Sequence, residues 1–438
     1  MPNHQNQHAI VIGGSIAGLL AARVLSERFE CVTIVDRDRL PVNAAPRRGV
    51  PQSVQPHVLF TTGYRILAKL FPDIGADLTA AGAIAFDWGR DFLCFQRGSW
   101  MPTTVEAIGM ESYTCTRPLL ESVIRHRARL LPNVKFLDGH RVVGLCSEEG
   151  AIRGLKLQAG DVVRECTADL VVDASGRSTR LPQWLSALGF TPPPATIIDA
   201  GLGYATRRYR IPERSQPAGK ILLIGHEPPQ QPRLGYLAQV EDGEWIATLG
   251  GYERDYPPLH ERGFLEFAQT LNDPAFYHAI ESAQPISEIR AHRATANRRY
   301  HYERIALPDG LIAIGDAVCA LCPVYGQGMT VSALSAIVLR RWLQQPSREL
   351  NGNSFHKQLA RTIAFPWSLA TGFDSRFVNT QGALKQHWAS KLFEGYTDRL
   401  SALARVDTQV HLRFLKMAHM QEPPSSLLDP RLLVRALF

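Results

Sequence analysis

Several features that would assign a class at once are missing from this 438-residue sequence. Its 48 Lys and Arg exceed its 41 Asp and Glu by only seven and are scattered rather than gathered in a basic stripe, so no nucleic-acid partner is expected. The seven cysteines are an odd number without the spacing of a small disulfide scaffold, which predicts reduced thiols in a cytoplasmic protein. The polar start lacks a secretory signal, and no repeat or low-complexity tract is present.

One uncharged run, Ala317–Leu339, is long enough by count to span a bilayer. Pro323 and the triplet Gly326-Gln327-Gly328 interrupt it near its middle, and such residues break a helix. The sequence therefore predicts a loop that leads into a buried helix, and no transmembrane segment.

The N-terminal part follows a strand, turn, helix and strand pattern. The apolar run His8–Ile12 precedes a glycine turn and apolar residues at helical spacing, and a β-branched run at Cys31–Val35 ends at Asp36. Gly13 allows a tight turn, Gly18 lets helix and strand approach closely, and the new helix points free N–H groups at a diphosphate. Asp36 is placed to accept hydrogen bonds from ribose hydroxyls, so the pattern predicts a dinucleotide site.

One position departs from this glycine fingerprint. Ser15 stands where the middle glycine is usual, with Gly14 before it and Ala17 two residues after it. Its side chain would either crowd the diphosphate or donate a hydrogen bond to it, while Gly14 supplies the missing backbone freedom.

The later sequence indicates an α/β protein with a second, antiparallel layer. Asp169–Gly176 and Leu311–Ile314 are apolar strands of the same buried sheet, and the second is followed by Gly315-Asp316. Between them, alternating runs turn through Asp242-Gly243, a strong hairpin signal. We expect a Rossmann-like domain at residues 1–190, an antiparallel substrate domain at 191–300, a return segment of the first domain at 301–345, and a helical C-terminal region at 346–438.

Several segments together resemble a known family. They are Gly315-Asp316-Ala317, Pro323–Thr330, Arg47–Gln52, Asp173–Gly176, Asp255–Pro258, Asn297–Tyr300 and Pro366–Gly372. Over nearly its whole length the sequence resembles FAD-dependent monooxygenases of the aromatic-hydroxylase and squalene-epoxidase type, and is most similar to bacterial epoxidases of polyketide polyenes.

The resemblance implies where FAD binds. Asp316 would contact the ribityl and diphosphate region, Arg117 the flavin side, Arg47 or Arg48 the ribityl chain, and the backbone of Val143 the adenine. The residues expected to bind FAD are Gly13, Gly14, Ser15, Ala17, Gly18, Asp36, Arg37, Arg47, Arg48, Arg117, Val143, Asp173, Asp316, Pro323, Gly326, Gln327, Gly328 and Met329.

The segment from Pro323 to Met329 also has a physical rationale for binding flavin. Its glycines permit the backbone to lie against the planar ring, and the following helix supplies N–H groups where reduced flavin is negative. The usual Asp-Gly pair is replaced by Asp173-Ala-Ser-Gly176, so NADH or NADPH either visits transiently or reduces the flavin through a partner flavin reductase.

The activity implied is monooxygenation through a flavin C4a-hydroperoxide, by epoxidation or hydroxylation of a hydrophobic natural-product intermediate. No catalytic residue and no metal is assigned, because the difficult chemistry belongs to the cofactor. One alternative is a flavin-linked disulfide oxidoreductase that uses Cys319 and Cys322, and another is a non-catalytic flavin-binding redox sensor. The Trp-x-Trp-x-Ile-Pro signature of flavin halogenases is missing.

Overall fold

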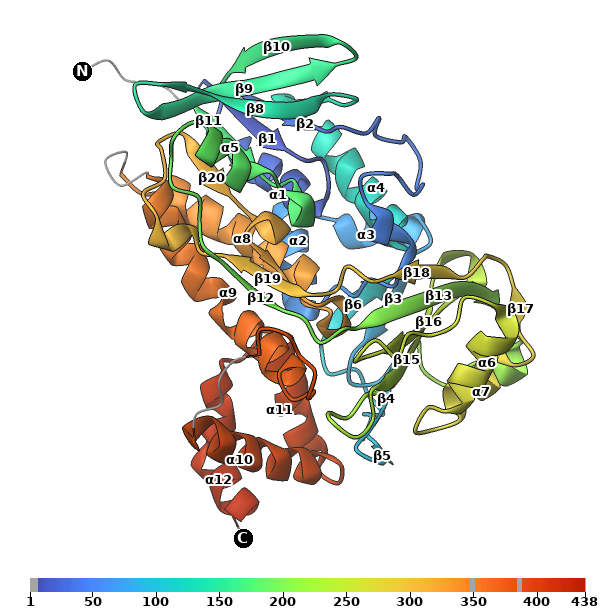
Figure 1. Cartoon of the computed structure of the whole chain (residues 1–438). Coiled ribbons are helices and arrows are strands. Elements are labelled where there is room, and N and C mark those ends of the chain that lie inside the picture. Colours follow the sequence, from blue (N-terminus) through green and yellow to red (C-terminus); the bar gives the residue numbers. More distant parts are fainter. Residues whose placement is uncertain (1–6, 347–350, 384–387, 438) are drawn as a thin grey trace.

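The computed structural model describes residues 7–346, 351–383 and 388–437. Its centre is a five-stranded parallel sheet in the order β20-β11-β1-β2-β7 (Figure 1). The strands are β1 (His8–Ile12), β2 (Cys31–Val35), β7 (Val134–Leu137), β11 (Leu170–Asp173) and β20 (Leu311–Ala313). As predicted, the apolar run near residue 312 returns to this sheet and pairs with β11, whose four residues are all buried.

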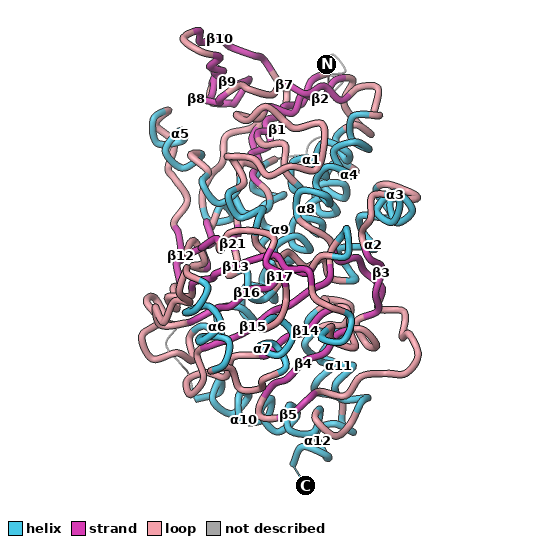
Figure 2. The backbone as a smooth tube through the Cα atoms, turned by 90° about the vertical axis from the view of Figure 1, so that its right-hand side faces the viewer, coloured by secondary structure: helices cyan, strands magenta, loops and turns pink. Residues whose placement is uncertain are grey.

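Helices lie on one side of this sheet and a small antiparallel sheet on the other (Figures 1 and 2). Helix α1 (Ile16–Leu25) packs against α4 (Arg117–Arg129) and α8 (Gly328–Leu343), and α2 (Thr61–Leu70) packs against α8. The small sheet contains β8 (Arg141–Glu148), β9 (Ala151–Ala159) and β10 (Val162–Thr167). This arrangement is the predicted Rossmann-like α/β fold.

The second large sheet has eight strands and is mainly antiparallel. Its path is β17-β13-β16-β15-β14-β4-β5, with β18 paired to β13. The bounds are β4 (Phe92–Gln96), β5 (Ser99–Trp100), β13 (Gly203–Arg210), β14 (Ile221–Ile224), β15 (Arg233–Gln239), β16 (Trp245–Gly251), β17 (Gln284–Pro285) and β18 (Arg290–His292). The hairpin predicted at Asp242-Gly243 joins β15 to β16, and both turn residues have positive φ angles. The sheet reaches beyond residues 191–300, because β4 pairs with β14 in parallel.

The remaining elements connect these layers and form the C-terminal part. They are α3 (Ile74–Ala80), β3 (Ile84–Asp87), β6 (Glu111–Thr114), α5 (Leu181–Ala187), β12 (Ala195–Ile198), α6 (Glu261–Gln269), α7 (Ala275–Ile280), β19 (Asn297–Tyr300), β21 (Cys319–Ala320), α9 (Gly352–Asp374), α10 (Trp388–Ala404), α11 (Thr408–Ala418) and α12 (Pro430–Leu437). Helices α6 and α7 pack on β14, β15 and β16, while α9 leads from the parallel sheet to α10–α12 (Figure 1).

The uncharged run Ala317–Leu339 forms short turns, β21 and most of α8, which confirms the predicted loop and buried helix. Of the helices that the structure describes, none combines the length and apolar character needed to cross a membrane.

Candidate cofactor site

The glycine turn after β1 brings α1 into very close contact with that strand. Gly13 has a φ of 104°, and a Cβ there would lie 2.6 Å from the carbonyl oxygen of Ala174. A Cβ at Gly18 would lie 1.8 Å from the carbonyl oxygen of Gly13. No side chain fits at either position, so α1 begins directly at the carboxyl end of β1. Ser15, the N-cap residue of α1, makes no side-chain cap, which leaves N–H groups of the first turn for an anion.

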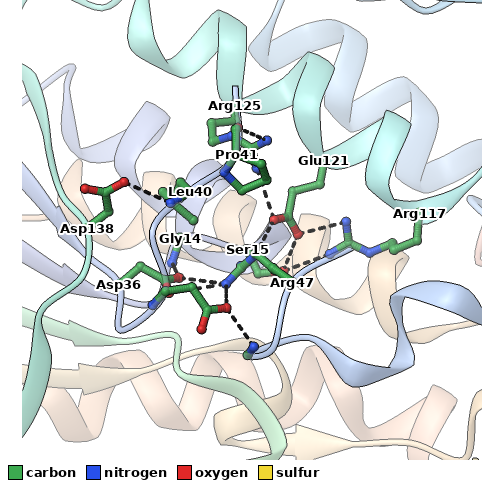
Figure 3. A network of polar contacts seen from close by, with 12 residues as sticks. Gly14, Ser15, Asp36, Leu40, Pro41, Arg47, Arg117, Glu121, Arg125 and Asp138 are labelled. Atoms are coloured by element: carbon green, nitrogen blue, oxygen red, sulfur yellow. Dashed lines mark hydrogen bonds and ion pairs between the residues drawn. The ribbon is translucent and has the colours of Figure 1, made fainter. Parts of the chain in front are cut away.

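Asp36 follows β2 and holds the glycine turn from the side (Figure 3). One carboxylate oxygen accepts the N–H of Gly14 at 2.7 Å, and the other accepts the N–H of Asp38 at 2.9 Å. Arg47 approaches both oxygens at 3.2 Å. Asp36, the predicted ribose-binding acid, is therefore hydrogen-bonded to the glycine turn.

Arg47 connects three carboxylates across the front of this turn. Besides Asp36, its guanidinium donates to Asp38 at 2.9 Å and to Glu121 of α4 at 2.9 Å. The Arg47 side chain is only 7% exposed. Burial lowers its pKa, but Glu121 and Asp36 outweigh burial, so the pKa stays above its usual value. Arg47 is thus a fixed cation beside the glycine turn, where the diphosphate is predicted, whereas the resemblance implied a place for it at the ribityl chain.

Glu121 is a residue at the centre of this network that was not predicted from the sequence. Its carboxylate lies between Arg117 at 3.1 Å and Arg125 at 3.2 Å, one helical turn away on either side, and it also accepts the hydroxyl of Ser15 at 2.8 Å. Although burial raises the pKa of Glu121, Arg117 and Arg47 hold it below its usual value. The i,i+4 spacing to two arginines was visible in the sequence. Its approach to Ser15, 106 residues away in sequence, was not.

The Ser15 side chain was expected either to crowd the diphosphate or to donate a hydrogen bond to it. In the structure it binds two side chains of α4 instead. Its hydroxyl donates to Glu121 and accepts from a terminal nitrogen of Arg117, both at 2.8 Å (Figure 3). The substitution of glycine by serine thereby links the turn to α4.

A cleft of about 980 Å³ opens beside Asp38, within the size range of ligand sites. Of the predicted residues, Arg37, Arg47 and Arg48 line it, and Arg141 of β8 joins them. Val143 lies two residues further along β8, at an irregularity in the β8–β9 register, and is half-buried. The cleft suits an anionic, nucleotide-like group.

The second segment predicted to bind FAD, around Gly315-Asp316, lies against the first, the glycine turn before α1. Gly315 follows β20, and a Cβ on it would lie 2.8 Å from the Cβ of Ala17, so the Gly315 turn packs directly on α1. Asp316 is half-buried, and its carboxylate has no hydrogen-bond partner among the described residues. Burial raises its pKa, while Arg177, Arg298 and Arg117 oppose this shift. An unpartnered acid at this edge suits a ligand that brings hydroxyl donors.

Asp173, at the end of β11, is turned into its own loop instead. Its carboxylate accepts the N–H and hydroxyl of Ser175 and the hydroxyl of Thr179, and it is fully buried. Burial raises its pKa. Asp173 therefore shapes the turn beside Gly13 rather than offering a free oxygen.

The segment from Pro323 to Met329 ends at the amino end of α8. Gly326 has a φ of 65°, Gln327 is the N-cap residue, and Gly328 is the first helical residue. Among the described residues, the buried side-chain oxygens of Gln327 and Thr330 have no hydrogen-bond partner, and a Cβ on Gly328 would meet nothing within 4 Å. Open space, orphaned polar atoms and helix N–H groups together fit the flavin part of FAD.

The cysteine pair is buried, His57 is half-buried, and the pKa shifts of all three favour their uncharged forms. Cys319 and Cys322 are each 1% exposed, and burial raises the pKa of Cys319 to about 12 and that of Cys322 well above its usual value. His57 contacts the carbonyl oxygen of Gln55 at 2.9 Å, and burial together with Arg117 lowers its pKa to about 3. Neither thiol has the thiolate character that redox exchange requires.

Comparisons with known proteins agree with this geometry. No family model matches the chain. Protein Rv3254 of Mycobacterium tuberculosis is 34% identical over 411 residues, which cover 89% of this chain and 85% of that protein. Squalene epoxidase 3 of Arabidopsis thaliana is 24% identical over 385 residues, covering 86% of this chain and 66% of that protein.

Solved flavoprotein structures share the fold. The flavin-dependent halogenase CmlS superposes with a TM-score of 0.65 at 16% identity, over 92% of this chain and 74% of that one. PqsL, a probable FAD-dependent monooxygenase from Pseudomonas aeruginosa, superposes with a TM-score of 0.62 at 15% identity, over 84% of this chain and 98% of that one. With the relatives above, these findings show that the chain belongs to the FAD-dependent monooxygenases of the aromatic-hydroxylase and epoxidase type, enzymes whose cofactor is FAD.

Proposed function

We propose that this enzyme transfers one oxygen atom from O2 to a hydrophobic natural-product intermediate, by epoxidation of an alkene or hydroxylation of a ring. The observation that carries the proposal is the direct packing of the Gly315 turn on Ala17. It joins two chain segments, one for each half of FAD, at a single sheet edge. A redox enzyme that handles O2 at a flavin needs both halves held rigidly.

The proposed division of FAD contacts follows the donors and acceptors of the site. Asp36 and the arginine-lined cleft would receive the adenosine part, and the first turn of α1 with Arg47 the diphosphate. Asp316 would accept hydroxyl hydrogen bonds of the ribityl chain, and the amino end of α8 would face the flavin ring. FAD, when bound and reduced, supplies the activation of O2.

The space for the substrate is proposed between the eight-stranded sheet and the Pro323–Met329 segment. Two buried clusters adjoin that segment, one through Phe60 beside Gly326 and one through Val324 and Tyr325. Their members are predominantly apolar or aromatic: Phe60, Phe86, Trp88, Met110, Ile221 and Ile246 in one, and Leu202, Leu234, Cys322 and Phe377 in the other. Such walls favour an apolar substrate and keep water away from the reacting oxygen. The names of the squalene epoxidase relatives support epoxidation.

The rival functions lack comparable support. The disulfide oxidoreductase needs reactive thiols, whereas Cys319 and Cys322 are buried with raised pKa values. Halogenases share the fold at about 15% identity, but the chain lacks their Trp-x-Trp-x-Ile-Pro signature. A flavin-binding sensor without turnover differs from the proposal in one measurable property, which is transfer of oxygen.

The test begins with purified protein and added FAD. Bound FAD is followed by its visible absorption, first with NADH or NADPH and then, if neither reduces it, with a flavin reductase. ¹⁸O₂ is then supplied with two probes, squalene and the PqsL ligand 2-aminobenzoylacetate. One labelled oxygen atom in a product supports the proposal. The proposal is contradicted if the reduced flavin consumes O2 but no labelled oxygen appears in either probe, or in a further set of apolar alkenes and arenes.

A further inference from the structure

A buried polar cluster at the end of α9 touches the proposed flavin segment from outside. Asp374 is the last residue of α9 and is 1% exposed. One of its carboxylate oxygens accepts the hydroxyl of Tyr325 at 2.6 Å. Tyr325 lies in the turn Pro323–Tyr325, directly before Gly326. The carboxylate therefore holds the middle of the segment that leads into α8.

The other oxygen of Asp374 reaches the start of the same segment through one intermediary. It accepts the side-chain amide of Asn297 at 2.6 Å, and the amide oxygen of Asn297 accepts the N–H of Cys322 at 2.7 Å. Asn297 is fully buried at the start of β19. Two separate arms thus run from one carboxylate to two points three residues apart, which fixes the position and the rotation of the turn between them.

Among the described residues, none of the side chains that donate a hydrogen bond to the Asp374 carboxylate is a cation. Tyr252, the residue that follows β16, donates to the same oxygen as Tyr325, but at 3.3 Å, and its hydroxyl also lies 3.3 Å from the hydroxyl of Tyr325. Its ring is stacked on Phe377 with 4.2 Å between ring centres, so its place does not depend on the hydroxyl. The carboxylate is held by uncharged donors only, and its geometry is set by them.

We propose that Asp374 is a positioning residue for FAD, which fixes the segment Pro323–Met329 and the amino end of α8 in the conformation that receives the flavin. The inference rests on the proposed function and adds to it a residue from the C-terminal helical region. The carboxylate acts through Tyr325 and Asn297 and does not itself touch the cofactor.

Two matched hydroxyl deletions separate this role from general stability. Tyr325→Phe removes the arm that belongs to the flavin segment. Tyr252→Phe removes a hydroxyl that contacts the same carboxylate oxygen and the Tyr325 hydroxyl, both at 3.3 Å, but on a residue outside that segment. Each variant is titrated with FAD by fluorescence, and the absorption spectrum and midpoint potential of the bound FAD are measured, with thermal unfolding as a check on folding.

For Tyr325→Phe we expect an FAD dissociation constant about tenfold higher, as for loss of one charge-assisted hydrogen bond, a shifted flavin spectrum and a lower midpoint potential. Tyr252→Phe keeps the 2.6 Å bond between Tyr325 and Asp374, so it should change each of the three much less. Asp374→Asn, which turns one accepting oxygen into a donor, should repeat the Tyr325→Phe change. Equal effects of the two tyrosine variants, or loss of unfolding temperature without a change in spectrum and potential, would overturn the inference. A wild-type protein that takes up no FAD would instead overturn the proposed function.

Discussion

Replacing Gly328 by alanine should raise the stability of the FAD-free protein and lower its affinity for FAD. Gly328 is the first residue of α8, has no positive φ, and a Cβ there would meet no atom within 4 Å. Without FAD, Gly328→Ala should therefore stabilise the fold by about 0.4–1 kcal/mol, because alanine restricts the unfolded chain. With FAD, the same methyl group would enter the space assigned to the flavin. Overpacking of this kind costs about 1–3 kcal/mol, or roughly five- to 150-fold in FAD affinity.

Gly395→Ala is the matched control. Gly395 is an exposed residue of α10, and a Cβ there would also meet nothing within 4 Å. This variant should raise the unfolding temperature of the FAD-free protein and leave FAD affinity unchanged. The measurements are thermal unfolding with and without FAD, and a fluorescence titration with FAD. If Gly328→Ala binds FAD as tightly as Gly395→Ala does, the flavin does not lie at the amino end of α8.

Four further outcomes follow from the site. Gly18→Ala should abolish FAD binding and lower the unfolding temperature, because its Cβ would lie 1.8 Å from a backbone oxygen; normal flavin content would refute the close packing. Asp36→Ala should weaken FAD binding about ten- to 100-fold in a titration, since charge-assisted hydrogen bonds contribute roughly 1.5–3 kcal/mol. Cys322→Ser should leave oxygen transfer intact, and lost turnover would revive the thiol mechanism. Burial raises the pKa of Asp374 to about 6. Between about pH 4 and pH 6, Asp374 is therefore protonated in the folded protein and ionised in the unfolded chain. The stability of wild type relative to Asp374→Asn should therefore rise as unfolding is measured from about pH 8 down to about pH 5, and a constant difference would contradict this pKa.

The parts of the site that could be predicted from the sequence are those in which chemistry depends on a few adjacent residues. The turn at Gly13–Gly18 and the acid at Asp36 follow a spacing that is dictated by one βαβ unit. Gly315-Asp316 could be found as well, because a short apolar strand directly precedes it. In each case, the backbone of a single supersecondary unit sets the position of the functional group.

The parts that sequence reasoning missed depend on side chains that converge from distant segments. Glu121 meets Ser15 across 106 residues, and Asp374 meets Asn297 across 77 residues. Strands β4 and β5 join the eight-stranded sheet through β14, more than 120 residues later. Helical or strand periodicity states which face of an element is buried, but not which partner from elsewhere packs on that face. Such partners have to be taken from the fold.

The charge balance of the network in Figure 3 bears on how FAD is received. Its ion pairs join three guanidiniums, of Arg47, Arg117 and Arg125, to three carboxylates, of Asp36, Asp38 and Glu121, so the charges of the ion-paired groups balance before a diphosphate arrives. A diphosphate at the first turn of α1 would compete with these carboxylates for Arg47, the residue shared by all three of them. Binding then exchanges one set of buried ion pairs for another instead of creating new ones, and the net gain is smaller than the number of contacts suggests. The helix N–H groups, which make no such exchange, would therefore contribute most of the affinity at the diphosphate.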